Sequence, residues 1–342
     1  NSIFKNEKKV DIFSSDQPDG LMTKLMGKNM MRKDGEPHLQ EKKAIFPTTS
    51  PKTTKEIWKK KFELAADQIL NSLTKKSGGD LVKDYAMPLS AEALKVVTGL
   101  TNMKRQEMDR VSQGMIDGIA NYNGDPLVEK HCRECIRSID NHISLIKDTY
   151  LENPDNSLLS VQMAAGISDQ QSRANIRLAI SGGQNEPRDA IAGTIWALLK
   201  HPEQLEAINR GQFTWLDAFE EFARWISPIG MSPRRVTKTC KIDNFDFSEN
   251  DRVFLMFSSG NRDEECFEKP DEFDISQNRS NTITFGAGPH FCAGAWISRC
   301  LIGQVALPKL FSSLPDLQLD PDSTVDFRGW AFRGPQKLTC TW

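Results

Sequence analysis

Hydrophobic and polar positions divide the chain into a long helical part and a shorter β part that follows it. In residues 53–209 apolar side chains recur mostly at helical spacing, with breaks at 77–80, 121–126 and 153–156. The longest predicted helix covers residues 169–200 and would be on the order of 45 Å long.

The pattern changes on both sides of this region. Residues 1–50 are rich in Lys, Met, Gly and Asp and predict loop with one short helix. Residues 234–257 alternate β-branched and polar side chains, which is typical of strands and turns. Residues 258–291 are irregular, a helix is expected from about Cys292 to about Leu314, and short strands follow from Leu317. The sequence therefore predicts a mainly α fold with a small β part late in the chain.

Composition narrows the class of protein. The 342 residues allow one large or two ordinary domains, and 38% hydrophobic with 26% charged residues is typical of a soluble globular protein. A net charge of −2 gives no basic field for nucleic acid, and no apolar run is long enough for a membrane span or a signal segment. Seven scattered cysteines favour a reducing cytoplasm and leave at least one thiol available for chemistry.

One ten-residue segment, residues 285–294 (FGAGPHFCAG), carries the most chemical information. Its glycines and proline predict a tight loop, and Cys292 stands at the expected start of a helix. A helix amino terminus lowers the pKa of a thiol, so we expect Cys292 to be a thiolate. His290, Phe291 and the glycines would let a flat, bulky partner lie against the loop. For a cysteine outside such a motif, a buried structural role would be the ordinary interpretation.

The segment resembles the haem-binding signature of the cytochrome P450 family, Phe-Gly-x-Gly-x-His-x-Cys-x-Gly, with every fixed position met. The resemblance implies a single haem domain over residues 1–342. Its cofactor would be haem b, bound to the loop residues Phe285, Gly286 and Gly294, with Cys292 as the axial ligand of the iron. Thiolate ligation favours cleavage of the O–O bond of dioxygen. Family members usually carry further strands and helices before Gly20, so we expect an amino-terminally incomplete haem domain.

Two further sets of residues match the family. Glu221 and Arg224 lie three apart on a predicted helix and resemble its structural Glu-x-x-Arg pair, with residues 261–273 matching the segment that follows it. His38 and Lys42 lie one helical turn apart and can face one ligand. The resemblance implies that these two residues, Arg235 and His290 bind the haem propionates. Lys42 stands where the family usually has Arg. A lysine cannot form the two parallel hydrogen bonds to a carboxylate that an arginine forms.

The segment Gly182-Gly183-Gln184-Asn185-Glu186-Pro187 falls where the family has its oxygen-activating helix. The small residues Gly182 and Gly183 would let this helix pass over the haem, and Pro187 would widen it by removing a backbone donor. Asn185 and Glu186 replace the family's usual acid–alcohol pair. We therefore expect Glu186 to relay protons through water, with a raised pKa.

The Gly-Gly-x-Asn-Glu-Pro string resembles a bacterial subgroup that includes reductase-fused monooxygenases and O-demethylases. It implies a monooxygenase that inserts one oxygen atom from O2 into a small organic substrate, in its most specific form the O-demethylation of a methoxyarene or a methylated sugar with release of formaldehyde. Electrons would come from a separate ferredoxin and its NAD(P)H-dependent reductase, or from a flavin/iron–sulfur reductase. Lys42, Lys43 and the lysines at 59–61 are either docking charges for that partner or a solvated helix face.

The sequence also allows two other functions for a haem protein of this kind. A peroxide-driven peroxygenase is the enzymatic alternative, and a haem sensor or electron carrier without turnover is the alternative from another class. Cys132 and Cys135, three apart on a predicted helix beside His131, are interpreted as packing residues because no second pair lies at zinc spacing. By alignment, the predicted pocket residues are Met22, Met26, Leu178, Gly182, Met231, Ala331 and Phe332.

Overall fold

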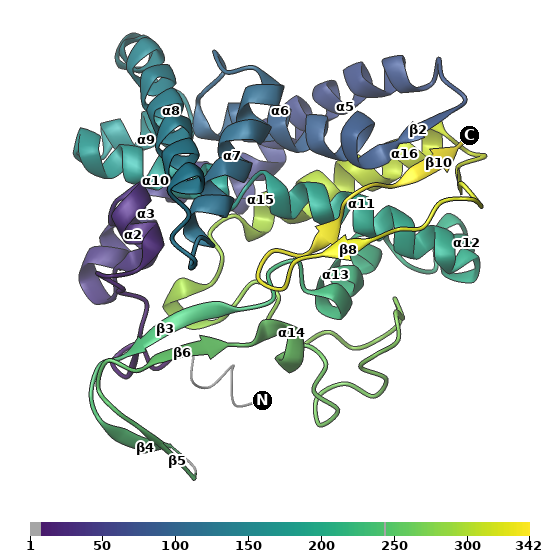
Figure 1. Cartoon of the computed structure of the whole chain (residues 1–342). Coiled ribbons are helices and arrows are strands. Elements are labelled where there is room, and N and C mark those ends of the chain that lie inside the picture. The colour runs from purple at the N-terminus through teal and green to yellow at the C-terminus, as the bar shows by residue number, and fades with distance from the viewer. Residues whose placement is uncertain (1–7, 243) are drawn as a thin grey trace.

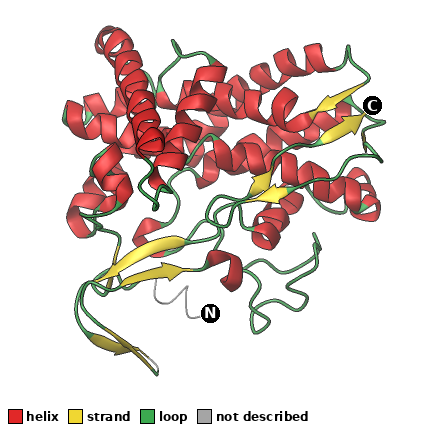
Figure 2. Ribbon diagram, viewed as in Figure 1, coloured by secondary structure: helices red, strands yellow, loops and turns green. Residues whose placement is uncertain are grey.

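The computed structural model describes residues 8–242 and 244–342 (Figure 1). Helices fill most of the molecule and the strands are short, which confirms the predicted mainly α fold with a small β part (Figure 2). The strands lie along one side of the helical body, and the hairpin β4–β5 projects away from it (Figure 1).

The first hundred residues contain more helix than their sequence pattern predicts. In particular, α3 (Gly35–Thr49) replaces the single short helix expected before residue 50. Its buried positions are His38, Glu41, Ile45 and Thr48, so polar residues face inward and no apolar periodicity reveals the helix. The other helices of this region are α2 (Leu21–Met26), η1 (Met30–Arg32), α4 (Pro51–Thr53), η2 (Thr54–Trp58), α5 (Lys59–Leu73), η3 (Val82–Ala86) and α6 (Met87–Thr98).

The middle of the chain is helical, and its breaks fall where the sequence places them. They coincide with β2 (Gly78–Asp80) and with the ends of α7 and α8. The helices are α7 (Arg105–Ile119), α8 (Pro126–Glu152), α9 (Leu158–Ala164), α10 (Asp169–Ser181), α11 (Asn185–Lys200), α12 (Pro202–Asn209) and α13 (Trp215–Ile226). Across the described ranges, the model contains no helix with the length and apolar character that a membrane crossing requires.

Close packing joins α7 to α8, which lie side by side in Figure 1. A Cβ added to Gly114 would overlap the sulfur of Cys135, and one added to Gly118 would overlap the sulfur of Cys132. Both sulfurs are fully buried and fill the spaces that these glycines leave. This contact agrees with the packing role predicted for Cys132 and Cys135.

The long helix predicted over residues 169–200 is interrupted. It forms two helices, α10 and α11, which are separated at residues 182–184. The Gly183 N–H donates to the Ile180 carbonyl at 3.4 Å, a tightened turn that closes α10, and the Arg188 N–H already donates to Gln184 in the first turn of α11. Pro187 is tolerated in that first turn, where a backbone donor is not needed. The helix therefore breaks at the glycine pair instead of only widening.

The late part of the chain forms small antiparallel sheets. One sheet has the strand order β1 (Phe13–Ser14), β3 (Ser232–Val236), β6 (Arg252–Leu255), and another has the order β2, β10 (Thr339–Thr341), β7 (Gln318–Leu319). Two-stranded pairs join β4 (Cys240–Ile242) to β5 (Phe245–Phe247) and β8 (Phe327–Arg328) to β9 (Gly334–Pro335). In the terminal segment, β9 pairs with β8, and β10 pairs with β2 and β7.

The remaining helices surround the cysteine loop. They are α14 (Phe257–Gly260), η4 (Gly288–His290), α15 (Ala295–Arg299), η5 (Cys300–Ala306) and α16 (Leu307–Ser313). Cys292 precedes α15 by three residues, so the predicted helix after the loop is confirmed as a continuous run of three elements. Buried apolar residues form two large clusters, one around α5, α11, α13 and η5 and the other around α7, α8 and α10.

Candidate functional site

A cavity of about 840 Å³ lies where these clusters and the small sheet meet. Its volume falls within the range of small-molecule and cofactor sites, about 300–1,000 Å³. It brings together residues that are up to 315 positions apart, from Gln17 to Phe332. The predicted residues that line it are His38, Lys42, Gly183, Glu186, Phe285, Gly286, His290, Cys292, Gly294, Met22, Leu178, Gly182, Met231, Ala331 and Phe332.

The cysteine loop is held in place by its own backbone. Gly286 and Gly288 adopt φ values of 70° and 65°, a left-handed conformation that side chains disfavour. The Cys292 N–H donates to the Phe285 carbonyl at 2.8 Å and closes the loop beneath the sulfur. The Cys292 side chain is exposed, and the space that it faces is the cavity.

The protonation state predicted for Cys292 is not what the chain alone produces. Burial raises the pKa of the Cys292 thiol, and the negative charge of Glu186 acts in the same direction. The Gly294 N–H and the Lys42 ammonium lower that pKa, but by less. In the chain alone, the surroundings of Cys292 therefore oppose the thiolate more than these two groups favour it.

Three of the residues predicted to bind the haem propionates, His38, Lys42 and His290, line the cavity. The His38 and His290 rings lie 4.2 Å apart between centroids. His290 Nε2 contacts the Asp34 carboxylate at 2.8 Å, while burial lowers the pKa of the imidazole. Lys42 donates to the carbonyls of Pro289 at 2.5 Å and Phe291 at 2.9 Å, and burial lowers the pKa of its ammonium. Lys42 thus supports the cysteine loop as well as adding charge.

The structure corrects the prediction for Arg235. Its guanidinium donates to the Asp16 carbonyl and to Asn250 Oδ1, and it does not line the cavity. The preceding residue, Arg234, is buried and lines the cavity instead. Alternate residues of a strand face opposite sides, so a choice that is wrong by one position reverses the side chain. The alternation along β3, with Arg234 and Val236 buried, is the signal that distinguishes the two arginines.

Sequence reasoning missed one cavity cation altogether. Arg32, in η1, is buried and lines the cavity near Arg234. No motif marks it, because the short 3-10 turn that carries it has no periodicity to read.

Glu186 and Asn185, adjacent in sequence, point to different places. Glu186 lines the cavity, its Oε2 is buried without a hydrogen-bond partner, and burial raises its pKa to about 8. Asn185 does not line the cavity: its amide donates to Gln113 Oε1 at 3.0 Å, and its oxygen accepts from Ser112. The structure therefore places Glu186, but not Asn185, where it can act on a bound molecule. Gly183 lines the cavity at the helix break.

One of the predicted pocket residues lies elsewhere. Met26 is fully buried in the cluster around α7, α8 and α10 and does not reach the cavity. It lies on α2, one turn after Met22, so the two methionines share a short helix but serve different surroundings.

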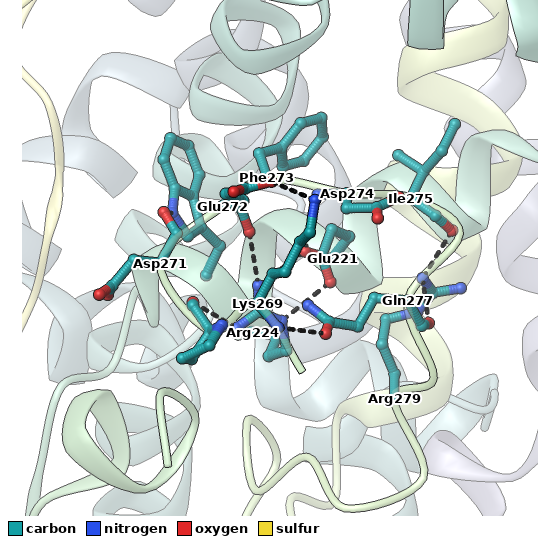
Figure 3. A network of polar contacts seen from close by, with 12 residues as sticks. Glu221, Arg224, Lys269, Asp271, Glu272, Phe273, Asp274, Ile275, Gln277 and Arg279 are labelled. Carbon is teal, nitrogen blue, oxygen red and sulfur yellow. Dashed lines mark hydrogen bonds and ion pairs between the residues drawn. The ribbon is translucent and has the colours of Figure 1, made fainter. Parts of the chain in front are cut away.

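Glu221 and Arg224 form a fully buried ion pair on α13 (Figure 3). Arg224 donates to both carboxylate oxygens of Glu221, at 2.9 and 2.7 Å, and to the carbonyls of Asn261, Pro270 and Glu272. Glu221 also accepts from the Asp274 N–H at 3.0 Å. The pair thus fastens the irregular segment after α14 to α13, the contact expected from residues 261–273.

The arrangement fits a haem. A thiol, basic side chains and two glycines line one cavity of cofactor size, which is what an iron porphyrin with two carboxylates requires. Within the described ranges, no cluster of three or more His, Cys, Asp or Glu side chains offers an alternative site for a bare metal ion.

Comparison with known proteins agrees with this chemistry. Residues 209–313 match a family model described as "Cytochrome P450". The chain is 26% identical over 324 residues to "Cytochrome P450 107B1" of Saccharopolyspora erythraea, covering 92% of this chain and 77% of that protein. It is 25% identical over 281 residues to "Steroid C26-monooxygenase" of Mycolicibacterium smegmatis, covering 80% of this chain and 69% of that protein.

Solved structures share the fold at low sequence identity. The structure of P450BioI in complex with an acyl carrier protein ligated to hexadec-9Z-enoic acid superposes with a TM-score of 0.90 at 19% identity. The superposition covers 100% of this chain and 90% of that one.

Proposed function

The chain belongs to the cytochrome P450 family of monooxygenases, and on that premise we propose that it O-demethylates a small methyl ether, a methoxyarene or a methylated sugar. One oxygen atom of O2 enters the methyl C–H bond, and the resulting hemiacetal breaks down to formaldehyde and an alcohol or phenol. The other oxygen atom leaves as water, with two electrons and two protons supplied from outside the substrate.

One observation carries the proposal: Cys292 and Glu186, from segments more than a hundred residues apart, face the same cavity. A haem, proposed here as haem b, supplies an iron that activates dioxygen when it is bound. Cys292 is its proposed ligand, and His38, Lys42, Arg234 and His290 would hold its propionates. Gly182 and Gly183 line the same cavity without adding side chains of their own.

Glu186 is the group that we propose to deliver protons. With a pKa of about 8 it holds a proton at neutral pH, and its partnerless Oε2 can pass that proton to a water in the cavity. The Glu186→Gln variant keeps the shape of the side chain but cannot exchange the proton. We expect normal haem content and less product for each electron consumed.

The choice of a methyl ether rests on the Gly-Gly-x-Asn-Glu-Pro string and on the apolar lining that Met22, Leu178 and Met231 provide. The relatives are named for steroid and polyketide chemistry, so larger hydroxylation substrates are the alternative that the assay has to test.

A separate ferredoxin with its reductase, or a flavin/iron–sulfur reductase, is the proposed source of electrons. Lys43, Lys60 and Lys61 are exposed and can contribute to docking an acidic carrier. All seven cysteines are free thiols, in keeping with a proposed reducing, cytoplasmic setting.

Two measurements test the proposal. The reduced protein with carbon monoxide should absorb at the wavelength that gives the family its name, and Cys292→Ser should lose that band. Methoxyarenes and methylated sugars should then be screened for a low- to high-spin shift, and those that bind should be assayed for formaldehyde. Hydroxylation of a steroid with no formaldehyde from any methyl ether would overturn the O-demethylase assignment and leave the monooxygenase class intact.

A further inference from the structure

Arg32 is a buried guanidinium that lines the cavity and has no counter-ion among the residues that the structure describes. Only 5% of the residue is exposed, and it lines the cavity. Its Nη1 donates to the Ser15 carbonyl at 3.4 Å, and its buried Nε has no hydrogen-bond partner. Among the ion pairs of the described residues, none involves Arg32. A charge in this position is costly unless an anion meets it.

The charged groups around Arg32 increase this need. Burial, and to a smaller extent the like charge of Arg234, lowers the pKa of the guanidinium to about 10. Asp16 and Asp34 act in the opposite sense, but among the described residues neither forms an ion pair with Arg32. Asp16 binds Lys28 through its Oδ2, and Asp34 binds His290 and Ser14. The like charge of Arg234 therefore adds to the need for an anion beside Arg32.

Arg32 lies near two other residues that line the cavity, Tyr122 and Arg234. Tyr122, in the loop between α7 and α8, lines the cavity and is 61% exposed, so it marks where the cavity reaches the surface. Tyr122 and Arg234 both act electrostatically on Arg32. Arg32 thus has both the exposed Tyr122 and the buried Arg234 within electrostatic range.

We propose that Arg32 binds a carboxylate inside the cavity. A guanidinium presents a planar fork that pairs with a carboxylate through two parallel hydrogen bonds, and the unpartnered Nε leaves this fork available. Two carboxylates have this chemistry: a haem propionate, and an acidic group on the substrate. The second source rests on the proposed function, because it makes the preferred ether an anionic one such as a methoxybenzoate.

The experiment compares Arg32→Gln and Arg32→Lys with the wild-type holoenzyme. Lys24→Gln is the matched control, since it removes a positive charge from an exposed side chain on α2 that does not line the cavity. One arm measures the rate of haem transfer to apomyoglobin. The other measures ferric spin-shift titrations with 4-methoxybenzoate and with neutral 4-methoxytoluene.

Each source predicts a different pattern. If the substrate supplies the carboxylate, Arg32→Gln weakens 4-methoxybenzoate at least about tenfold. The affinity for 4-methoxytoluene and the rate of haem loss then stay unchanged. If a propionate supplies it, haem loss accelerates about tenfold or more, and both ligands are affected equally. In either case Arg32→Lys, which keeps the charge but loses the fork, recovers part of the loss and provides a measurable variant if Arg32→Gln does not fold.

Unchanged haem loss and unchanged affinity for both ligands in Arg32→Gln would overturn the proposal. Failure of the proposed function gives a different result, because the wild type itself would then bind neither methyl ether. The haem-transfer rates of the wild type and Arg32→Gln would still decide the role of Arg32.

Discussion

Individual side chains in the cavity take their charge state from burial more than from their neighbours. Desolvation is the largest influence on the pKa of Glu186, Arg32 and Cys292, and it opposes the charged form in each case. A bound cofactor with two carboxylates and a cationic metal centre would place opposite charges beside Arg32 and Cys292 and so favour their charged forms.

The raised pKa of Glu186 has a consequence for stability. The unfolded carboxyl loses its proton near pH 4.5, while the folded one keeps it to about pH 8. The folded state therefore holds the extra proton in this window, and stability falls as the pH rises through it. Between about pH 6 and 8 the wild type should lose on the order of 1–2 kcal/mol that Glu186→Gln does not lose. Urea unfolding at several pH values measures this difference, and parallel profiles for the two proteins would contradict it.

Arg234 and Arg235 offer a direct test of strand register. Arg234→Met removes a cation that lines the cavity, whereas Arg235→Met removes one bonded to Asp16 and Asn250 outside it. We expect Arg234→Met to speed haem loss by about tenfold, the equivalent of roughly 1.4 kcal/mol. Arg235→Met should leave the rate near that of the wild type. Equal effects of the two substitutions on the rate of haem loss would mean that Arg234 holds the haem no better than Arg235 does.

The sequence predicts individual site residues reliably only where a motif with several fixed positions marks them. The cysteine loop has six fixed positions, so Cys292, His290 and the loop glycines were identified from sequence alone and do line the cavity. The sequence does not show which residues of β3 face the cavity, so it points to Arg235 in place of Arg234. It also does not show which side of α2 faces the cavity, so it includes Met26. Arg32 has no motif, because only the three-dimensional fold brings a 3-10 turn beside a strand 200 residues later.

At the level of elements, the break between α10 and α11 gives the cavity its open side. Apolar periodicity continues across residues 169–200, so the sequence pattern could not show the interruption. The reason lies in local backbone geometry: two glycines lower the cost of leaving the helix, and Pro187 favours a new first turn. Helix α3 was underestimated for the opposite reason, because its inward residues are polar.

The two glycines of this break should respond differently to a methyl group. A Cβ on Gly183 would lie 2.5 Å from the Ala179 carbonyl oxygen and 2.9 Å from Leu94, whereas on Gly182 its nearest neighbours are at 3.5 and 3.6 Å. Gly183→Ala should therefore cost about 1–3 kcal/mol of folding free energy. Gly182→Ala should fold normally, and the comparison of their thermal unfolding midpoints measures the difference. Equal midpoints would show that the backbone at Gly183 relaxes freely.

For the whole molecule, the cavity is the place where distant segments meet. Residues from the first helices, the α10–α11 break, the strand β3, the cysteine loop and the carboxyl-terminal part all line it. A ligand that fills the cavity therefore contacts segments from several separate parts of the fold, and binding it is coupled to folding.

Haem binding should accordingly stabilise the entire chain. With haem at about a thousandfold excess over its dissociation constant, the gain is about 4 kcal/mol. Denaturant unfolding of the protein with and without haem should show one shifted transition, followed in parallel by far-UV circular dichroism and tryptophan fluorescence. A shift limited to one of the two probes would mean that the haem stabilises only part of the fold.

The sulfur-to-glycine contacts between α7 and α8 bear on how a substrate enters. Cys132 and Cys135 are seated opposite Gly118 and Gly114, so neither helix can slide along the other without forcing a sulfur against backbone. We expect the two helices to move together as one rigid unit. The exposed Tyr122 lies in the loop that joins them and lines the cavity, so a movement of the pair would widen or narrow the cavity at Tyr122.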